Sequence, residues 1–359
     1  MNKTKCQDIT YCLEIDEAKN SISSFARGAK RIFLVHGHSS YIVCGAKILF
    51  DQLAVTLGWD LVEFEDFSQN PKKDDVDAGV ELLLRQIPDV VIAVGGGSVL
   101  DMAKLIRHYA GLKLPLLAIP TTAGTGAEST QFAVCYIDGI KHSISDVTIL
   151  PDSVILYPQL TYCNNRYLTS CTGFDALAQA IEAYWNINAT SESDKYALEA
   201  IDAIYPLLLK ENLTPDERAS ILKGANNAGK AINITKTTVP HALSYVLTSK
   251  YGYPHGHAVA LTFPFFFKYN KDGGKAVYKG KDYKQHIAKM NRLYALMGIR
   301  DDPYMAMKRY ISQLGLAFNP MKDFDDATVI RGINLERAKN TPIAIDENII
   351  SDAVKSIRE

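Results

Sequence analysis

The chain has 359 residues, and its 39 lysines and arginines nearly balance its 40 aspartates and glutamates. This length can bury a sizeable core and predicts about two domains. The charge balance argues against a broad nucleic-acid-binding surface, and the 47% apolar content argues against disorder.

The N-terminal stretch lacks the apolar region of a secretory signal, and no run of about 18 apolar residues predicts a transmembrane helix. Six cysteines without a C-x-x-C pair do not form a disulfide framework. We therefore expect a cytoplasmic protein with no membrane and no nucleic-acid partner.

Short apolar runs alternate with helical patterns over the first 150 residues. The expected strands are 31–36, 61–67, 89–94 and 114–119, and the expected helices are 47–57, 74–86 and 101–109. Strands that alternate with helices predict a parallel sheet with crossover helices. We predict an α/β, Rossmann-like dinucleotide-binding domain over residues 1–157.

Helical patterns dominate the rest of the chain. The expected helices are 175–185, 192–209, 220–231, 237–247 and 284–297. Because no β-type runs separate them, we predict that residues 158–359 form an all-α domain that binds metal and substrate.

Two loops of small residues each follow an expected strand. Gly95, Gly96, Gly97 and Ser98 open a helix, where free backbone N–H groups and the helix dipole favour a phosphate. The segment 121–126 (TTAGTG) follows the next strand. Open α/β sheets bind ligands at such ends. The alternative is two tight turns that bind no ligand.

Four residues of the second predicted domain form a candidate metal site. Asp175 and Gln179 stand four apart on an expected helix and share one face. His241 and His255 follow later. A carboxylate and two imidazoles can hold a first-row divalent ion with an open position for substrate. The alternative is that these residues are structural.

Five strings in the chain, in this order and spacing, resemble the iron-containing alcohol dehydrogenase family. They are GGGSVLDMAK, IPTTAGTGAE, CTGFDALAQAIEAYW, VPHALSY and PHGHAVAL. The resemblance implies the fold that this family shares with 3-dehydroquinate synthase. It also implies a nicotinamide cofactor, a divalent metal, Fe²⁺ or Zn²⁺, and a homodimer.

The resemblance also implies roles for single residues. Lys141 matches a catalytic lysine near the nicotinamide, and Asp175, His241 and His255 match three of four metal ligands. The positions that match cofactor contacts are Gly37, His38, Ser39, Asn70, Gly95, Gly96, Gly97, Ser98, Asp101, Thr121, Thr122, Thr125 and Lys141.

Two positions depart from the family pattern. Gln179 stands where the fourth ligand is normally histidine, and a neutral amide oxygen is a poorer ligand for Fe²⁺ or Zn²⁺. Gly37 stands where NAD-preferring relatives commonly place aspartate, with His38 and Ser39 beside it. An acid there would repel a 2′-phosphate, so its absence favours NADP(H) over NAD(H). The alternative is a plain turn at the end of the strand that accepts either cofactor.

The residues before His241 carry charge where general family members are small or apolar. Lys236 and Thr237 lie within about one helical turn of this ligand, with Lys230 further upstream. The stretch resembles the phosphonoacetaldehyde reductase branch of the family. We expect these three residues to bind an anionic group, and His257 or a metal-bound water to supply the proton. The alternative is that both lysines point to solvent.

We therefore predict the NAD(P)H-dependent reduction of a short anionic aldehyde, most specifically phosphonoacetaldehyde to 2-hydroxyethylphosphonate. Residues 218–271 hold seven lysines and arginines and no acid, which suits an anionic substrate. The alternatives are a general alcohol or polyol dehydrogenase with a neutral substrate, a lyase similar to 3-dehydroquinate synthase, and a metal-free nucleotide-binding protein.

Overall fold

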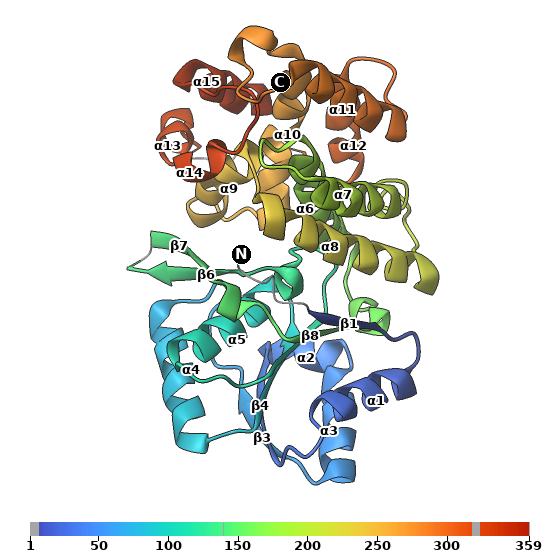
Figure 1. Cartoon of the computed structure of the whole chain (residues 1–359), viewed down its shortest axis with the longest axis vertical. Helices are drawn as coiled ribbons and strands as arrows, with labels where there is room; N and C mark the ends of the chain where they lie inside the picture. Colours follow the sequence, from blue (N-terminus) through green and yellow to red (C-terminus); the bar gives the residue numbers. More distant parts are fainter. Residues whose placement is uncertain (1–6, 139, 318–323, 359) are drawn as a thin grey trace. The chain divides into compact units, whose positions relative to one another are not determined.

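The computed structural model describes residues 7–138, 140–317 and 324–358, and its chain divides into two compact units. The first unit comprises Met1–Asn164 and Thr214–Asn226, and the second comprises Asn165–Leu213 and Asn227–Glu359. Figure 1 labels the helices and strands of both units.

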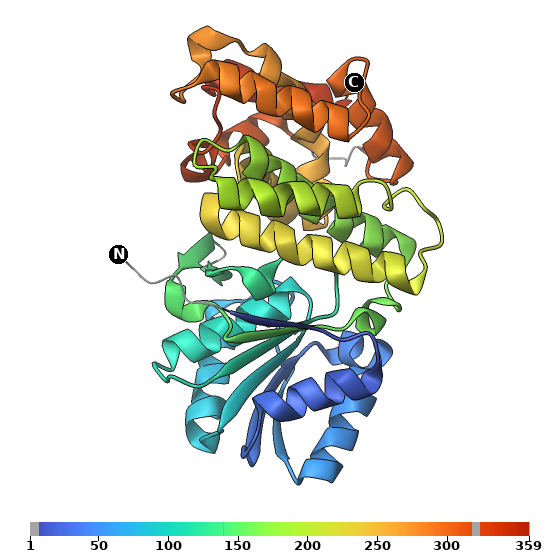
Figure 2. The same cartoon turned by 45° about the vertical axis from the view of Figure 1, so that its right-hand side comes forward.

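A six-stranded parallel sheet organises the first unit (Figure 2). Its spatial order is β1-β8-β5-β4-β2-β3, and each neighbouring pair is parallel. The strands are β1 (Asp8–Tyr11), β2 (Arg31–His36), β3 (Asp60–Phe64), β4 (Val90–Gly95), β5 (Leu116–Pro120) and β8 (Ser153–Leu156).

Alternate residues of the central strands enter two different cores, as the period of two along a strand requires. Ile92 on β4 belongs to a cluster with residues of α1 (Ile15–Phe25) and α3 (Ala46–Leu57). Its neighbour Val91 belongs to a cluster with residues of α4 (Lys73–Gln86) and α5 (Gly97–Tyr109). Helices therefore cover both faces of the sheet, and the predicted α/β fold is confirmed.

All four predicted strands are present within a few residues of their expected bounds. The sequence missed β1 and β8, each only four residues long. It also missed the antiparallel pair β6 (Phe132–Ile137) and β7 (Ile140–Ser145). The short helix α2 (His38–Val43) was not predicted either.

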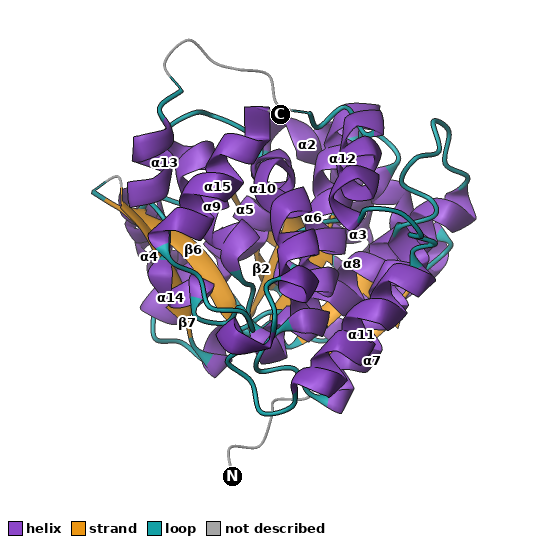
Figure 3. Cartoon of the chain, turned by 90° about the horizontal axis from the view of Figure 1, so that it is seen from above, coloured by secondary structure: helices purple, strands orange, loops and turns teal. Residues whose placement is uncertain are grey.

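Helices build the second unit, and every strand among the described residues belongs to the first. Figure 3 colours the helices purple and the strands orange. Its central helices are α6 (Arg166–Trp185), α9 (Val239–Ser249) and α10 (His255–Asp272), and α10 packs against both others. The others are α7 (Ser191–Ile204), α11 (Tyr283–Leu296), α12 (Pro303–Gln313), α13 (Asp326–Arg331), α14 (Leu335–Ala338) and α15 (Glu347–Lys355).

Helix α8 (Pro215–Thr235) is divided between the two units, which differs from the predicted boundary at 157/158. Its residues up to Asn226 group with the first unit because Leu222 packs on Val154 and Leu156 of β8. In addition, the guanidinium of Arg218 donates to the carbonyl of Thr161. Apolar contact with the sheet, which spacing along α8 does not reveal, explains this division.

No helix in the described part of the chain is long and apolar enough to cross a membrane. The five cysteines within the described residues are free, and three of them are buried. Cys163 is exposed, and Cys44 is half-buried.

Candidate active site

The three predicted metal ligands come together in the second unit. Asp175 lies in the middle of α6, His241 on the first turn of α9, and His255 is the first residue of α10. Their ligand atoms all lie within 4.8 Å of one another. Asp175 and His241 are buried, whereas the His255 side chain is 32% exposed. The cluster is therefore accessible from the side of His255.

A buried carboxylate orients His241. Glu182 Oε1 accepts from His241 Nδ1 at 2.5 Å, which leaves Nε2 directed at Asp175 Oδ1, 3.1 Å away. Glu182 Oε2 accepts from the backbone N–H and hydroxyl of Thr238 at 2.6 and 2.7 Å. The hydroxyl of Thr238 accepts in turn from the indole N–H of Trp185. This network fixes the ring of a ligand, as carboxylates behind metal-bound histidines commonly do.

A similar arrangement holds His255. Ser244 donates its hydroxyl to the carbonyl of His241 at 2.8 Å, so its oxygen can accept from His255 Nδ1 at 3.4 Å. That tautomer directs His255 Nε2 at Asp175 Oδ1, 3.7 Å away. The Nε2 atoms of His241 and His255 thus both face the carboxylate of Asp175.

These donors fit a divalent cation. Burial would lower the pKa of His241, but the charges of Glu182 and Asp175 and their hydrogen bonds raise it to about 9. Without an ion, therefore, the two carboxylates keep a proton on this ring. A divalent cation can replace the proton and neutralise the same charges, and one carboxylate with two imidazoles suits Fe²⁺ or Zn²⁺.

Gln179 is buried one turn after Asp175 on α6. It therefore shares a helix face with Asp175, as the spacing predicted. Its role as the fourth ligand stays a prediction.

Gly256 lets α10 approach α6 closely at this site. A Cβ atom on Gly256 would lie 1.9 Å from the carbonyl oxygen of Cys171 and 3.1 Å from Asp175 Cβ. No L side chain fits there without moving the backbone. The glycine after the ligand His255 therefore sets the distance between the helices that carry His255 and Asp175.

Both ring nitrogens of His257 have protein partners. Nε2 donates to the carbonyl of Ala317 at 3.2 Å, so Nδ1 accepts from the hydroxyl of Tyr167 at 2.8 Å. Burial lowers the pKa of His257, which keeps the ring neutral. His257 can thus exchange a proton through Tyr167, which is 44% exposed. Its role as proton donor stays a prediction.

The phosphate-binding loop predicted in the first unit is closely packed. Gly96 caps α5, and the backbone N–H groups of Val99 and Leu100 bond to its carbonyl. A Cβ on Gly95 would lie 2.5 Å from Val99, and one on Gly97 would lie 2.8 Å from Thr125. The glycines therefore allow this loop to pack against the second loop.

Other predicted cofactor residues gather around the start of α5. The N–H of Asn70 donates to the hydroxyl of Ser98 at 3.3 Å. A Cβ on Gly96 would lie 3.4 Å from Thr122 Oγ1, and the N–H of Thr121 bonds to the carbonyl of Gly95. Three loops that follow β3, β4 and β5 thus meet at one edge of the sheet.

Asp101 lies on α5 and the half-buried Lys141 on β7. Asp101 accepts from the N–H of Val134 on β6 and lies 3.6 Å from the buried ammonium of Lys104. Burial raises the pKa of Asp101, while Lys104 and Lys141 act to lower it. These contacts indicate that Asp101 holds β6 against α5, in addition to any contact with a cofactor.

His38 has an acidic partner. Gly37 caps α2, and His38 is exposed, with Nδ1 3.2 Å from Glu65 Oε2. Ser39 lies on the exposed first turn of α2. The prediction that NADP(H) is preferred was made from Gly37, His38 and Ser39, without the contact between His38 and Glu65.

The predicted anion-binding residues lie near the end of α8. The hydroxyl of Thr237 is buried and accepts from Arg337 at 2.9 Å. Lys236 is exposed, with a left-handed backbone (φ 63°). Lys230 lies 3.4 Å from Asn227 Oδ1 and over the ring of Tyr196, which indicates a structural role.

Sequence reasoning missed two residues of this site, Glu182 and Arg337. Glu182 stands seven residues after Asp175 and so shares its helix face, which was a usable signal. Arg337 lies 100 residues from Thr237, and nothing in the sequence links the two.

Two family models match this chain. Residues 11–158 match a model described as iron-containing alcohol dehydrogenase, and residues 169–336 match the C-terminal model of the Fe-containing alcohol dehydrogenase family. The chain belongs to the iron-containing alcohol dehydrogenase family. It is therefore an oxidoreductase, and its family implies a divalent metal and NAD or NADP.

A relative and two solved structures are similar over most of their length. A phosphonoacetaldehyde reductase from Streptomyces viridochromogenes is 29% identical over 77% of this chain and 78% of the relative. An iron-containing alcohol dehydrogenase from Thermotoga maritima has a TM-score of 0.84 at 26% identity, covering 98% of this chain and 97% of its own. A sulfoacetaldehyde reductase from Bifidobacterium kashiwanohense, solved with NAD⁺, has a TM-score of 0.81 at 26% identity, covering 99% and 98%.

Proposed function

We propose that this enzyme reduces a short aldehyde bearing a phosphonate, phosphonoacetaldehyde in particular, to the corresponding alcohol. The observation that carries the proposal is a chain of contacts from the metal ligands to a guanidinium. His241 bonds to Glu182, Glu182 to Thr238, and the adjacent Thr237 to Arg337. The guanidinium of Arg337 is therefore linked to the predicted metal ligand His241 through this series of contacts.

Arginine suits a tetrahedral oxyanion, because its planar fork of N–H donors forms paired, charge-assisted hydrogen bonds. Glu336 pairs with Lys339, so this neighbouring acid is directed to another cation. Two side-chain amides fix the loop that carries Thr237. Asn340 donates to the carbonyl of Thr237, and Asn186 donates to that of Lys236.

In this proposal Arg337 binds the phosphonate and Lys236 adds charge from the exposed side. Thr237 holds the guanidinium in place, whereas the sequence assigned it directly to the substrate. The reductases of phosphonoacetaldehyde and sulfoacetaldehyde support this substrate class, because both named compounds are two-carbon aldehydes with a tetrahedral oxyanion.

Asp175, His241 and His255 hold the metal in this proposal, with Gln179 beside them. A divalent ion supplies Lewis-acid polarisation of the carbonyl group. When bound, the reduced nicotinamide would supply a hydride to the carbonyl carbon, and the carbonyl oxygen would take up a proton. We assign this proton to His257, which can exchange it with solvent through the hydroxyl of Tyr167. Glu182 keeps His241 in the required tautomer.

The test is a panel of aldehydes with NADH and NADPH, run after reconstitution with Fe²⁺ or Zn²⁺. We expect the highest kcat/KM for phosphonoacetaldehyde, and activity that depends on the metal. Preference for propionaldehyde would support a general alcohol dehydrogenase. Full activity in metal-free protein would contradict the assigned ligands. Light scattering of the same sample tests the predicted homodimer.

A further inference from the structure

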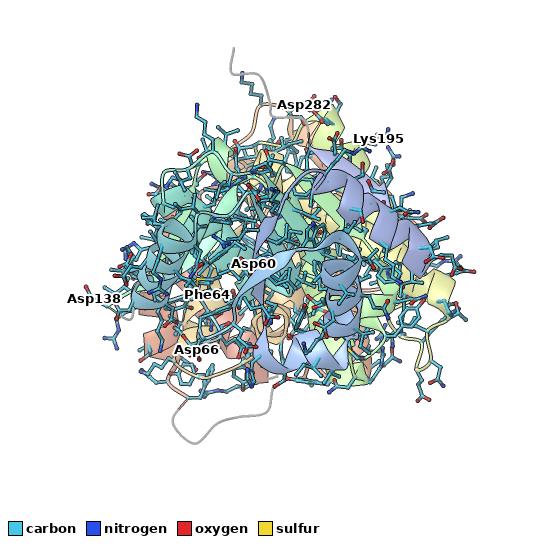
Figure 4. All side chains as sticks on the ribbon, turned by 90° about the horizontal axis from the view of Figure 1, so that it is seen from below. Asp60, Phe64, Asp66, Asp138, Lys195 and Asp282 are labelled. Atoms are coloured by element: carbon cyan, nitrogen blue, oxygen red, sulfur yellow. The ribbon has the colours of Figure 1, made fainter. Side chains whose placement is uncertain are left out.

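Carboxylates at the end of β3 lie beside the turn that joins β2 to α2. Glu65 Oε2 is 3.2 Å from His38 Nδ1 and 3.6 Å from His36 Nδ1. Glu63 Oε1 is 3.5 Å from His36 Nε2. Figure 4 labels Phe64 and Asp66, the residues on either side of Glu65. Both glutamate side chains are about 40% exposed and are therefore accessible to a ligand.

This turn adjoins the glycine loop. A Cβ on Gly37 would lie 3.6 Å from Val99 on the first turn of α5. Strands β4, β2 and β3 are consecutive neighbours in the sheet. A dinucleotide whose phosphates lie on Gly96–Ser98 therefore extends its adenosine ribose over Gly37, toward the end of β3.

The charges around this ribose position are mostly acidic, because Lys47 on α3, which interacts electrostatically with Glu63 and Glu65, is paired with Asp51. Residues 63–71 contain Glu63, Glu65 and Asp66 and no lysine or arginine, and residues 37–44 contain neither lysine nor arginine. Burial lowers the pKa of His36, so this ring stays neutral and does not cancel the charge of Glu65. His38 is the only imidazole in the turn that can face a phosphate, and it already faces Glu65.

We propose that Glu65 accepts a hydrogen bond from the 2′-hydroxyl of the adenosine ribose and makes the enzyme prefer NAD(H) to NADP(H). The 2′-phosphate of NADP(H) would place about two negative charges beside Glu65 and offers no donor to it at neutral pH. This preference is the opposite of the one that Gly37 suggested. The inference rests on the proposed binding of the cofactor at Gly95–Ser98.

The test compares the binding of NADH and NADPH by their fluorescence, without aldehyde. The variants are Glu65→Gln and Glu81→Gln, whose glutamate is exposed on α4 of the same unit. We expect the wild type to bind NADH at least about tenfold more tightly than NADPH, and Glu65→Gln to reduce this ratio by about tenfold. Glu81→Gln should leave both dissociation constants unchanged.

Tighter binding of NADPH by the wild type would overturn the inference, as would an equal change for both cofactors in Glu65→Gln. Either result leaves the glycine loop as the cofactor site. If the wild type binds neither cofactor, the glycine-loop assignment itself fails, and the inference fails with it.

Discussion

Glu182 and His241 form a buried hydrogen bond of 2.5 Å between Oε1 and Nδ1. The glutamate lies two turns after Asp175 on α6, so one helix supplies both a predicted ligand and the group that orients another. Thr238 and Trp185 complete the network. The geometry of the site thus depends on contacts that a list of ligands does not contain.

Replacing Glu182 with glutamine should weaken metal binding by about 10- to 100-fold, because the amide cannot hold His241 as a charged acceptor does. The measurement is metal content after dialysis against a graded series of chelator concentrations. Glu199→Gln is the matched control, because Glu199 is an exposed acid of the same unit whose contact is with Asn227. If the two variants retain metal equally, Glu182 does not contribute to metal binding.

Replacing Gly256 with alanine should displace His255 from Asp175. The added Cβ meets the backbone of Cys171 at 1.9 Å, and backbone cannot rotate away as a side chain can. Metal content should fall, together with the melting temperature. Gly173→Ala on α6 is the control, since the three atoms nearest to its added Cβ all belong to the side chain of Leu208, which can rotate. If Gly256→Ala binds metal as the wild type does, helix separation does not control the site.

Replacing Lys236 with glycine should stabilise the fold and impair the enzyme. A non-glycine residue in the left-handed region costs about 1–2 kcal/mol, partly offset by the entropy of glycine, so we expect a net gain of about 0.5–1 kcal/mol in unfolding free energy. Urea denaturation measures the gain. In the proposed function, the KM for phosphonoacetaldehyde rises at the same time.

The control for Lys236→Gly is Ile87→Gly, at an exposed position with the same backbone conformation (φ 49°) at the end of α4. It should give a similar gain in stability with no change in KM. If Lys236→Gly raises stability and leaves every KM unchanged, Lys236 is a helix-ending residue only and takes no part in binding.

Local pattern predicted much of the fold. Continuous apolar runs bounded by glycine or proline identified the central strands, and β2 has the predicted bounds Arg31–His36. Helix α10 was not predicted, because Pro264 interrupts its pattern and a proline inside a helix normally ends it. Strands β1 and β8 were not predicted, because four residues are too few to show a recognisable alternation of apolar and polar side chains.

The candidate site was predictable where the sequence gathers its residues into motifs. Asp175, His241 and His255 follow from their motifs, and the structure brings them together. The pairing of Thr237 with Arg337 depends on how α14 packs on α9, where the N–H of Asn334 bonds to the carbonyl of Ala242. No spacing in the sequence encodes that contact.

Replacing Arg337 tests directly whether a cation linked to the metal ligands through Thr237 selects an anionic aldehyde. The measurement is the ratio of kcat/KM for phosphonoacetaldehyde to that for propionaldehyde, in the wild type, in Arg337→Met and in the control Arg331→Met, at an exposed position on α13. We expect Arg337→Met to lower this ratio by about 10- to 100-fold, through KM for the phosphonate, and the control to leave it unchanged. An unchanged ratio in Arg337→Met would show that Arg337 does not select the anionic aldehyde.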